Sequence, residues 1–250
     1  MSGPDSQRTV NATQTSVSVL EALAEADGTV GVTELANRLS IPKSTAYKHL
    51  NTLYEVGFVN KTGREYELGL RLADLGERAR ATDPLYRTAR PHIDQLVSVT
   101  DQPAGLVVEH EGLAVDLYRT TPARQIQVQL PNSRYLHCSA PGKAILASLS
   151  SERVGEILDG TGLPQKTDRT LSDRSALREK LDRIAERGIA FERGEQRASR
   201  RAVAVPITQN GSVLGAVYVA GTSDRLKSKR FEEDIPGILI STVKRFLPEL

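Results

Sequence analysis

Three short helical patterns followed by two strand-like runs occupy residues 13–68, and this order restricts the fold more than any other feature of the sequence. The first pattern is expected to stop at Asp27-Gly28, and it places four apolar residues on one helical face: Val17, Leu20, Leu23 and Ala24. The second pattern, about two turns long, starts at Gly31, which can act as an N-cap with Glu34 reaching back to it. Three helices and a hairpin in this order predict a winged helix-turn-helix.

The third helical pattern, from about Lys43 to Tyr54, has two chemically different faces. At 100° per residue, Ala46, Leu50 and Leu53 share one side, and polar or hydrogen-bonding side chains occupy the other: Ser44, Tyr47, Lys48 and Asn51. After Gly57, the runs 58–61 and 64–68 flank a glycine-containing turn, which is typical of a hairpin. The apolar face is expected to pack on the core, and the polar face is left to bind a partner.

The charge of the chain is balanced overall but not locally. With 33 Lys plus Arg and 31 Asp plus Glu, the formal net charge of +2 does not suit a protein that coats nucleic acid through bulk charge. Between residues 43 and 64, however, four basic side chains oppose Glu55 alone: Lys43, Lys48, Lys61 and Arg64. This local excess lies on the expected third helix and hairpin, where a DNA-binding protein of this class needs it.

We predict that the polar face of the third helix enters the major groove of double-stranded DNA, which admits an α-helix. Lys48 can donate to guanine and Asn51 can pair with an adenine edge. Lys43, Lys61 and Arg64 are better placed for backbone phosphates. The full predicted DNA-binding set is Lys43, Ser44, Thr45, Tyr47, Lys48, Asn51, Lys61 and Arg64. The alternative is that the same polar face mediates protein contacts.

Downstream of the hairpin, an amphipathic pattern from Leu70 predicts a connecting helix that ends near Thr82. Asp83-Pro84 reads as the cap and first turn of a further helix, which Pro91 is expected to interrupt. We therefore divide the chain into a flexible terminus (1–12), the winged helix-turn-helix domain (13–72), and the connecting helix with a second domain (73–250).

From Gly105 the apolar spacing changes to the alternation typical of strands. Strands are expected at 106–109, 113–118, 126–130, 189–192, 202–207 and 213–220, the last two joined by an Asn210-Gly211 turn. Helices are expected at 143–149, 152–158 and 173–187, and a final helix at about 229–247 should bend or break near Pro236-Gly237. Strands on both sides of a helical insert predict an α+β domain with an antiparallel sheet.

Several classes of protein are excluded or disfavoured. The single cysteine, Cys138, cannot form an internal disulfide, and four scattered His residues give no zinc-site spacing, so we expect neither a metal nor a cofactor. No apolar run approaches the roughly 20 residues of a membrane span, and the N-terminus lacks the apolar centre of a signal peptide, so we expect a soluble, cytoplasmic protein. His137-Cys138 is the best catalytic candidate, but neighbours in a strand point to opposite faces, and we expect no enzyme.

Seven short motifs, in order across both domains, resemble the IclR family of transcription regulators. Those of the DNA-binding domain are Gly31–Ala36, Pro42–Leu53, Gly57 and Tyr66–Gly69. Those of the effector domain are Ser139–Ala147, Thr167–Thr170 and Ala202–Ile207. The resemblance covers nearly all of the chain from residue 13 onward. It implies a GAF-like effector domain that binds a small molecule, often an organic acid, and homodimers or tetramers that read palindromic operators.

The resemblance also points to a ligand site. Ser139, Ala140, Pro141 and Gly142 open a helix whose N–H groups and dipole favour a carboxylate. The alternative is an ordinary capped helix start with a solvated Lys143.

A second part of this site follows from aligning Ala204–Pro206 with the family. The family's acidic ligand contact then falls on Glu192, and its frequent Cys falls on Ala202, so sulfur-dependent metal or ligand binding is doubtful. The nearby arginines could attract an anion, although a solvated charged loop is the commoner arrangement: Arg193, Arg197, Arg200 and Arg201.

The leading hypothesis is a sequence-specific transcription regulator in which effector binding shifts the population of dimer arrangements and so the spacing of two recognition helices. The alternatives are a protein-interaction adaptor, or a small-molecule sensor or enzyme, with a winged helix that does not bind DNA.

Overall fold

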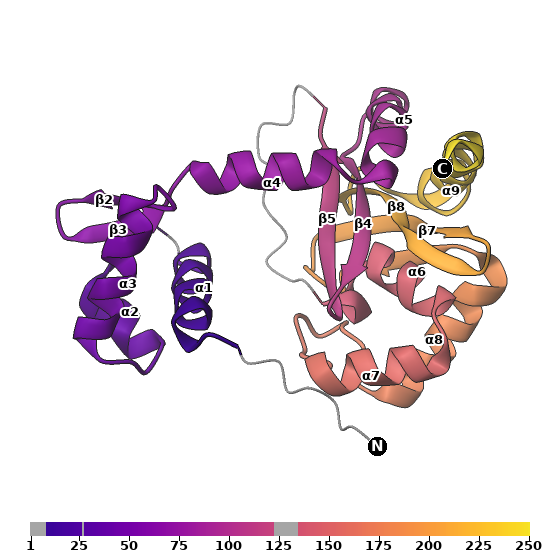
Figure 1. Ribbon diagram of the computed structural model, residues 1–250. Coiled ribbons are helices and arrows are strands. Elements are labelled where there is room, and N and C mark those ends of the chain that lie inside the picture. Colours follow the sequence, from indigo (N-terminus) through magenta and orange to yellow (C-terminus); the bar gives the residue numbers. More distant parts are fainter. Residues whose placement is uncertain (1–8, 27, 123–134) are drawn as a thin grey trace, which may run out of the picture. The chain divides into compact units, whose positions relative to one another are not determined.

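A computed structural model describes residues 9–26, 28–122 and 135–250 (Figure 1). The chain divides into two compact units, Met1–Arg80 and Ala81–Leu250, and each is considered by itself. The strand expected at 126–130 lies outside the described residues, as does Asp27.

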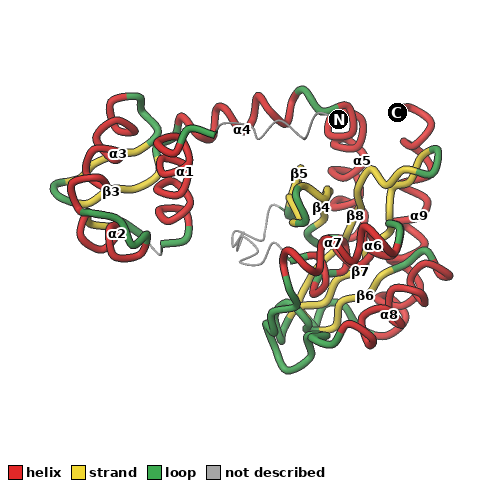
Figure 2. The backbone as a smooth tube through the Cα atoms, turned by 60° about the horizontal axis from the view of Figure 1, so that its bottom comes forward, coloured by secondary structure: helices red, strands yellow, loops and turns green. Residues whose placement is uncertain are grey.

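The first unit is a three-helix domain with a small antiparallel sheet. Its elements are α1 (Asn11–Ala24), β1 (Val30–Gly31), α2 (Val32–Arg38), α3 (Lys43–Glu55), β2 (Val59–Thr62) and β3 (Glu65–Leu68), followed by α4 (Arg71–Ala81). Figure 2 shows α1, α2 and α3 gathered around the short strands. Leu35, Leu50 and Tyr66 are almost completely buried in the shared core. The winged helix-turn-helix predicted from the sequence is confirmed.

The first helix differs from its prediction in start and in buried face. It begins at Asn11, two residues earlier than expected. Leu23 is buried and Leu20 packs against the core, as predicted, but Val17 and Ala24 are exposed, and Val19 and Ala22 supply the remaining buried contacts. The segment contains two overlapping apolar sets at helical spacing, and spacing alone cannot choose between them, because the choice depends on how the helix is rotated against α3.

Gly31 is the N-cap residue of α2, as predicted, but its surroundings differ from the prediction. Val30 and Gly31 form a two-residue strand that pairs with β3, and it is too short to show an alternating pattern in the sequence. Glu34 does not reach back to Gly31. Its carboxylate accepts a hydrogen bond from Arg38 at 2.6 Å instead, because a side chain four residues on lies on the same exposed helix face.

The second unit is an α+β domain built on a five-stranded antiparallel sheet of order β5-β4-β8-β7-β6. Its strands are β4 (Ala104–His110), β5 (Leu113–Thr120), β6 (Ala190–Arg193), β7 (Arg200–Gln209) and β8 (Ser212–Thr222). Its helices are α5 (Pro84–Thr100), α6 (Ala140–Ser148), α7 (Ser151–Thr161), α8 (Arg174–Arg187) and α9 (Ile235–Phe246), with single turns at Leu136–Cys138 and Leu247–Glu249. The predicted antiparallel α+β class is confirmed.

Each face of this sheet has its own hydrophobic core. On one face, α5 and α9 pack on Val203, Val205, Val217 and Val219. On the other face, α6, α7 and α8 cover Ala202, Ala204, Ala216, Tyr218 and Ala220 (Figure 1). Adjacent residues of β7 and β8 therefore belong to opposite cores, as strand geometry requires. The small residues on the second face leave room there for polar groups.

Helix α5 is continuous, and the interruption expected at Pro91 is wrong. Asp83 caps the helix, its Oδ1 accepting from the Tyr86 N–H at 3.2 Å, and Pro91 lies in the interior on the exposed side. Proline removes one hydrogen bond and disfavours an interior position. The opposite side of α5 buries Ala89, Ile93 and Leu96 against the sheet, and this packing outweighs the local preference.

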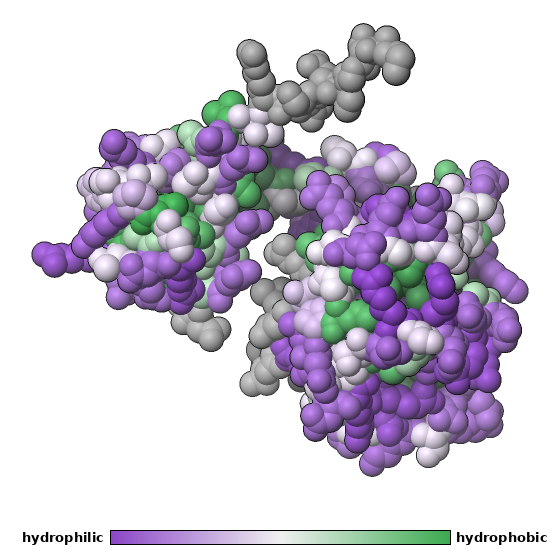
Figure 3. Space-filling view, turned by 90° about the horizontal axis from the view of Figure 1, so that it is seen from below, coloured by the Kyte–Doolittle hydropathy of each residue, from purple (hydrophilic) through white to green (hydrophobic). Residues whose placement is uncertain are grey.

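The C-terminal helix changes type close to the predicted break. Arg230–Asp234 has π-helical hydrogen bonding, and α9 begins at Ile235 with Pro236 in its first turn, where the missing N–H costs nothing. None of the described helices is long and apolar enough to cross a membrane. On the face drawn in Figure 3, hydrophilic residues cover most of both units and apolar residues form small patches.

Candidate nucleic-acid interface and effector site

Helix α3 has the two faces that the sequence predicts. Ala46 and Leu50 are fully buried, and Leu53 is 5% exposed. On the opposite side, the side chains are accessible to a partner: Lys43, Ser44, Tyr47, Lys48 and Asn51 are exposed, and Thr45 is partly buried. Glu55, the acid of this segment, stands at the C-terminal end of the helix. The accessible face can therefore donate hydrogen bonds along most of its length.

Local backbone geometry fixes the position of α3. Ser40, with φ of +53°, makes the turn after α2, and the Ile41 N–H donates to the Ala36 carbonyl at 3.0 Å. Pro42 then occupies the N-cap position. A hydrogen bond of 2.8 Å between Ser16 Oγ and His49 Nδ1 ties α3 to α1. These contacts leave the polar face directed away from the core.

The hairpin of β2 and β3 carries the remaining predicted cations. Lys61 pairs in register with Tyr66, and its Nζ lies 5.5 Å from the centroid of that buried ring. Gly63, with φ of +63°, makes the turn, and Arg64 follows it on the surface. Lys61 and Arg64 are both exposed, so the wing presents two cations. All eight residues of the predicted DNA-binding set thus lie on α3 and this hairpin.

In the second unit, the predicted effector residues begin at the N-terminus of α6. Ser139 caps the helix, its Oγ accepting from the Gly142 N–H at 3.1 Å, and Ala140, Pro141, Gly142 and Lys143 are buried. A side chain at position 142 would stand 2.2 Å from the Leu136 carbonyl oxygen, which explains the glycine. Because Pro141 has no N–H and Ser139 occupies that of Gly142, Ala140 has the N–H left for a ligand in this first turn.

Lys143 is not solvated, contrary to the alternative drawn from the sequence. Its side chain is 0% exposed and its ammonium group is paired with the carboxylate of Glu195. Thr167 Oγ1 donates to the Gly194 carbonyl at 2.7 Å, and Thr170 Oγ1 donates to the Glu195 carbonyl at 2.6 Å. The Thr167–Thr170 segment therefore holds the loop that places Glu195 next to Lys143. A buried charge is costly unless it is paired, so the buried ammonium of Lys143 requires the carboxylate of Glu195.

Glu192 and Ala202 face each other in the register of β6 and β7. Glu192 is completely buried; its carboxylate lies 3.3 Å from Arg200 Nε and accepts from the Gln196 N–H at 3.3 Å. Burial raises the pKa of Glu192 above its usual range, although Arg200 and Lys143 oppose the shift. Burial disfavours the charge of Arg200, but Glu192, Tyr218 and Asp116 together more than compensate, and the pKa of the guanidinium is raised.

The polar arrangement continues onto β5 and β8. The guanidinium of Arg200 lies 5.9 Å from the centroid of the Tyr218 ring, and Tyr218 Oη donates to Asp116 Oδ1 at 3.1 Å. Arg119 lies 4.0 Å from Asp116. Burial raises the pKa of Asp116, and burial also raises that of Tyr218. We refer to these residues together as the buried polar cluster: Asp116, Arg119, Lys143, Glu192, Glu195, Arg200 and Tyr218.

Sequence reasoning missed Asp116, Arg119, Glu195 and Tyr218 as parts of this cluster. A usable signal was present in β5, where Asp116 and Arg119 interrupt an otherwise apolar run three residues apart. Tyr218 gave none, because an aromatic residue in an apolar strand ordinarily belongs to the core. The cluster unites residues far apart in sequence, which only the strand order reveals.

The arginines near β6 and β7 do not form one solvated loop. Arg193 is exposed, but its guanidinium lies 4.8 Å and 4.9 Å from the ring centroids of Phe191 and Phe231. Arg201 Nη1 donates to the Leu226 carbonyl at 2.7 Å. Arg200 points to the opposite side of the sheet from Arg201, into the buried polar cluster, because the two are neighbours in β7.

The catalytic candidate His137-Cys138 lies in a 3-10 turn, so the strand geometry assumed for it is wrong. His137 Nε2 is 3.2 Å from the Pro164 carbonyl, and Cys138 Sγ donates to the Tyr135 carbonyl at 3.5 Å. Burial lowers the pKa of His137. Across residues 9–26, 28–122 and 135–250, no group of His, Cys, Asp or Glu side chains is arranged to hold a metal ion.

Comparison with protein families assigns both units. Residues 14–63 match the family model of the IclR helix-turn-helix domain, and residues 79–245 match that of the bacterial transcriptional regulator IclR C-terminal domain. The chain belongs to the IclR family. It is a DNA-binding transcription regulator with an effector-binding C-terminal domain, as predicted from its motifs. The adaptor and sensor or enzyme alternatives find no support.

Relatives of this IclR-family protein resemble it over most of their length. The HTH-type transcriptional regulator KdgR of Escherichia coli is 30% identical over 220 residues, which cover 86% of this chain and 82% of the relative. An IclR transcriptional regulator from Alicyclobacillus acidocaldarius has the same fold, with a TM-score of 0.83, 23% identity and coverage of 96% and 99% of the two chains. An IclR homologue from Microbacterium hydrocarbonoxydans, solved in complex with 4-hydroxybenzoate, has a TM-score of 0.77, 22% identity and coverage of 96% and 98%.

Proposed function

We propose that this regulator reads its operator with the accessible face of α3. Lys48 and Asn51 contact base edges in the major groove, assisted by Ser44, Thr45 and Tyr47. Lys43 and the wing cations, Lys61 and Arg64, bind backbone phosphates. The observation that carries the proposal is the division of α3 into a fully buried apolar side and an accessible side with donors. Two copies on a palindromic operator would place two α3 helices in successive major grooves. The regulator would act in the cytoplasm, where the chromosome lies.

Two substitutions separate base contacts from phosphate contacts. Binding is measured on the DNA upstream of the regulator's own gene, and on single-base variants of it, at several salt concentrations. Lys61→Ala should weaken binding to all fragments alike and reduce the slope of log K against log salt by about one for each protomer. Lys48→Ala should reduce discrimination between fragments, by about 1–3 kcal/mol at the contacted position.

Lys229→Ala serves as the matched control, because Lys229 is an exposed lysine of the second unit, outside the proposed interface. Identical behaviour of Lys48→Ala and Lys61→Ala on every fragment would contradict the division of roles. Absence of any salt-dependent binding to the upstream DNA would contradict the operator proposal itself.

For the second unit, we propose that the effector is an organic acid bound between the start of α6 and the sheet. Its walls are the residues predicted from the sequence: Ser139, Ala140, Pro141, Gly142, Glu192 and Ala202. The Microbacterium homologue bound to 4-hydroxybenzoate supports a carboxylate ligand. Since α6 offers few free N–H groups, the carboxylate would pair with the guanidinium of Arg200, whose planar donors suit a bidentate carboxylate.

Thermal unfolding with a panel of carboxylic acids, 4-hydroxybenzoate included, tests this site. An acid that binds the native protein raises its melting temperature in a concentration-dependent way. Arg200→Met should abolish that rise, and Arg193→Met, an exposed arginine nearby, should not. An equal rise in wild type and Arg200→Met would place the acid elsewhere. Recovery of the acid unchanged after incubation is expected of a binding domain, and its conversion would indicate an enzyme.

A further inference from the structure

The buried polar cluster contains equal numbers of acids and cations, arranged as three pairs: Asp116 with Arg119, Glu195 with Lys143, and Glu192 with Arg200. Tyr218 stays neutral, because burial raises the pKa of its phenol group. The proposed effector adds one more carboxylate to this balanced set. A buried charge without a counter-charge is costly, so the complex must gain a positive charge or lose a negative one.

Glu192 is the acid that the added carboxylate affects first. Its side chain is 0% exposed and its Oε2 lies 3.3 Å from Arg200 Nε, whereas the Arg200 side chain is 23% exposed. The guanidinium is therefore within reach of a small acid, while water does not reach the carboxylate of Glu192. The other two acids keep their own partners, since Glu195 remains with the fully buried Lys143 and Asp116 remains with Tyr218.

The charges around Glu192 determine how readily it takes up a proton. Burial raises the pKa of Glu192, and Arg200 is the strongest of the groups that oppose this rise, followed by Lys143. A carboxylate on Arg200 weakens that opposition and adds a negative charge beside Glu192, so the pKa rises further. The groups that face Glu192, directly or through these partners, come from every surrounding element: Arg200 of β7, Lys143 of α6, Glu195 of the loop after β6, Tyr218 of β8, Asp116 of β5 and Lys180 of α8.

Two carboxylates on one guanidinium share a proton readily, because like charges in contact do not both stay ionised. Glu192 Oε1 accepts from the Gln196 N–H, and Oε2, next to Arg200, is the oxygen that would meet the acid. We propose that the organic acid binds together with one proton from the solvent, which is held between the acid's carboxylate and the carboxyl group of Glu192. The proton forms an O–H bond with one carboxylate and a hydrogen bond to the other, no other bond forms or breaks, and the charge of the cluster stays balanced.

This inference rests on the proposed binding of the acid at Arg200, and it adds a form of regulation to that site. Between the folded-state pKa of Glu192 in the free protein and its higher pKa in the complex, binding takes up a proton and is therefore favoured by a lower pH. The affinity should fall by up to about tenfold for each pH unit as the pH rises through this window. The regulator would thus respond to the same concentration of acid more strongly as the pH falls.

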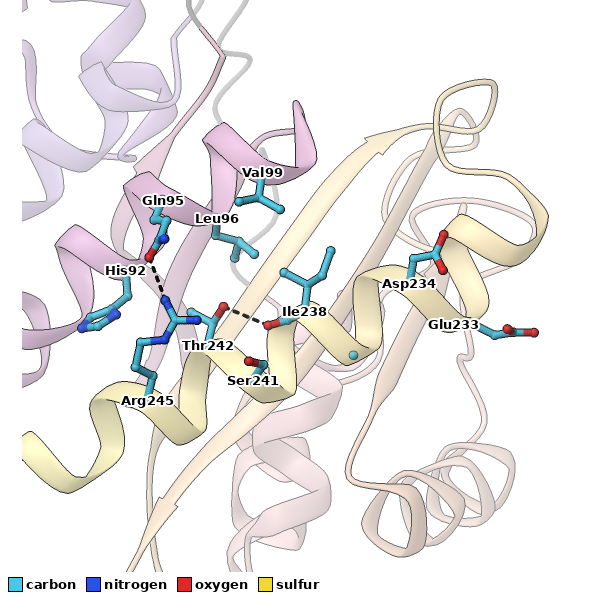
Figure 4. Close-up of a pocket in the computed structure, with 11 residues that line it drawn as sticks. His92, Gln95, Leu96, Val99, Glu233, Asp234, Ile238, Ser241, Thr242 and Arg245 are labelled. Atoms are coloured by element: carbon cyan, nitrogen blue, oxygen red, sulfur yellow. Dashed lines mark hydrogen bonds between the residues drawn. The ribbon is translucent and has the colours of Figure 1, made fainter.

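An acid bound in the groove between α5 and α9, on the other face of the sheet, could also take up a proton. Arg245 lies there beside His92 and donates to Gln95 Oε1 at 2.9 Å (Figure 4), and Glu249 lies 4.0 Å from His92. Histidine is the side chain that changes its charge near neutral pH, so an acid at this end of the groove would also bind with protons. Proton uptake alone therefore does not identify Glu192, and substitutions on both faces are needed.

The test is isothermal titration calorimetry of the full chain with acetate, succinate, benzoate and 4-hydroxybenzoate. Each titration is run at pH 6.5 and 7.5 in Pipes and in imidazole, because a buffer that supplies a proton adds its own ionisation enthalpy to the heat of binding. We expect a heat that depends on the buffer and corresponds to the uptake of up to one proton for each acid bound. Infrared difference spectra of wild type give a second readout, since binding should produce the carbonyl stretch of a protonated carboxyl group.

Three variants locate the proton. Glu192→Gln keeps the size of the side chain but cannot titrate, so it should bind the acid with no dependence on buffer and with an affinity that does not change with pH. Glu232→Gln is the matched control, because this glutamate is 60% exposed, and it should keep the wild-type uptake. His92→Gln should also keep it.

The inference and the proposed function fail in different ways. Absence of binding by every acid, or equal binding in Arg200→Met, would contradict the proposed site and this inference with it. Binding that requires Arg200 but depends on neither buffer nor pH, with no infrared signal of a protonated carboxyl group, would leave the proposed site intact and overturn the inference. Proton uptake that persists in Glu192→Gln would also overturn it, and its loss in His92→Gln would place the proton on the other face of the sheet.

Discussion

Removal of one partner of the Lys143–Glu195 pair should destabilise the second unit strongly. Lys143 is 0% exposed and Glu195 11% exposed, so Glu195→Gln leaves an ammonium group without its carboxylate in a site that water does not reach. Breaking a buried pair in this way costs about 3–5 kcal/mol. Glu192, which also acts on Lys143, should keep the cost near about 3 kcal/mol. For a unit of this size, that corresponds to a fall in melting temperature of about 6–12 °C.

Urea and thermal unfolding followed by circular dichroism measure this effect. The control is Asp159→Asn, which breaks the Arg174–Asp159 pair, whose side chains are 56% and 71% exposed, and should cost less than about 1 kcal/mol. The hydrogen bonds that Thr167 and Thr170 make to the loop use main-chain carbonyls and survive the Glu195→Gln change. A loss no larger than that of Asp159→Asn would refute the reasoning, because it would mean that water reaches Lys143.

Two further substitutions test the packing and the electrostatics of the same region. Gly142→Ala should lower the unfolding free energy by about 1–3 kcal/mol, because the new Cβ would lie 2.2 Å from the Leu136 carbonyl oxygen. The control is Gly155→Ala, at a helical position with open space, which should be neutral or stabilising. Equal effects of the two substitutions would contradict the packing argument. Glu192→Gln should gain stability relative to wild type as the pH rises from 5 to 8. Because the pKa of Glu192 is raised in the folded state, its protonated form stabilises the fold at low pH, and this contribution is lost as the pH rises through the folded-state pKa. Glutamine does not titrate, so the variant does not lose stability in this way. A difference in urea midpoints that does not change with pH would show that the Glu192 carboxyl group is not desolvated.

Local signals in the sequence predicted much of the fold. The bounds of α3 agree within one residue, and the β4–β5 and β7–β8 turns occur where predicted. These turns have positive φ at both central residues, Glu111-Gly112 and Asn210-Gly211, which is the chemistry of a tight hairpin. Glycines that end helices were equally predictable, as at Gly188 after α8. Signals of this kind depend on a few neighbouring residues, and tertiary structure did not override them.

Features that depend on packing between distant segments were not predictable. Pro91 breaks a helix by propensity, yet α5 continues because its other side is held by the sheet. Lys143 and Glu195 are 52 residues apart, and Asp116 and Tyr218 are 102 residues apart, so no periodic pattern could join them. The start of α6 was predicted as part of the ligand site, but whether Lys143 is solvated depends on a partner from the loop after β6.

The buried polar cluster and the core beneath α5 and α9 lie on opposite faces of one sheet, and β8 connects them. Tyr218 faces Asp116 and Arg200, while its neighbours Val217 and Val219 belong to the core beneath α5 and α9. Glu192 joins β6 to β7, its carboxylate 3.3 Å from Arg200 Nε, so a carboxylate bound to the Arg200 guanidinium, as proposed above, would compete with Glu192. Such an exchange changes the contacts of Arg200 with Tyr218 at the centre of the sheet. Close-packed neighbours transmit a displacement of this kind, so an acid bound at Arg200, as proposed above, would alter through β8 the packing on the face that α5 and α9 cover.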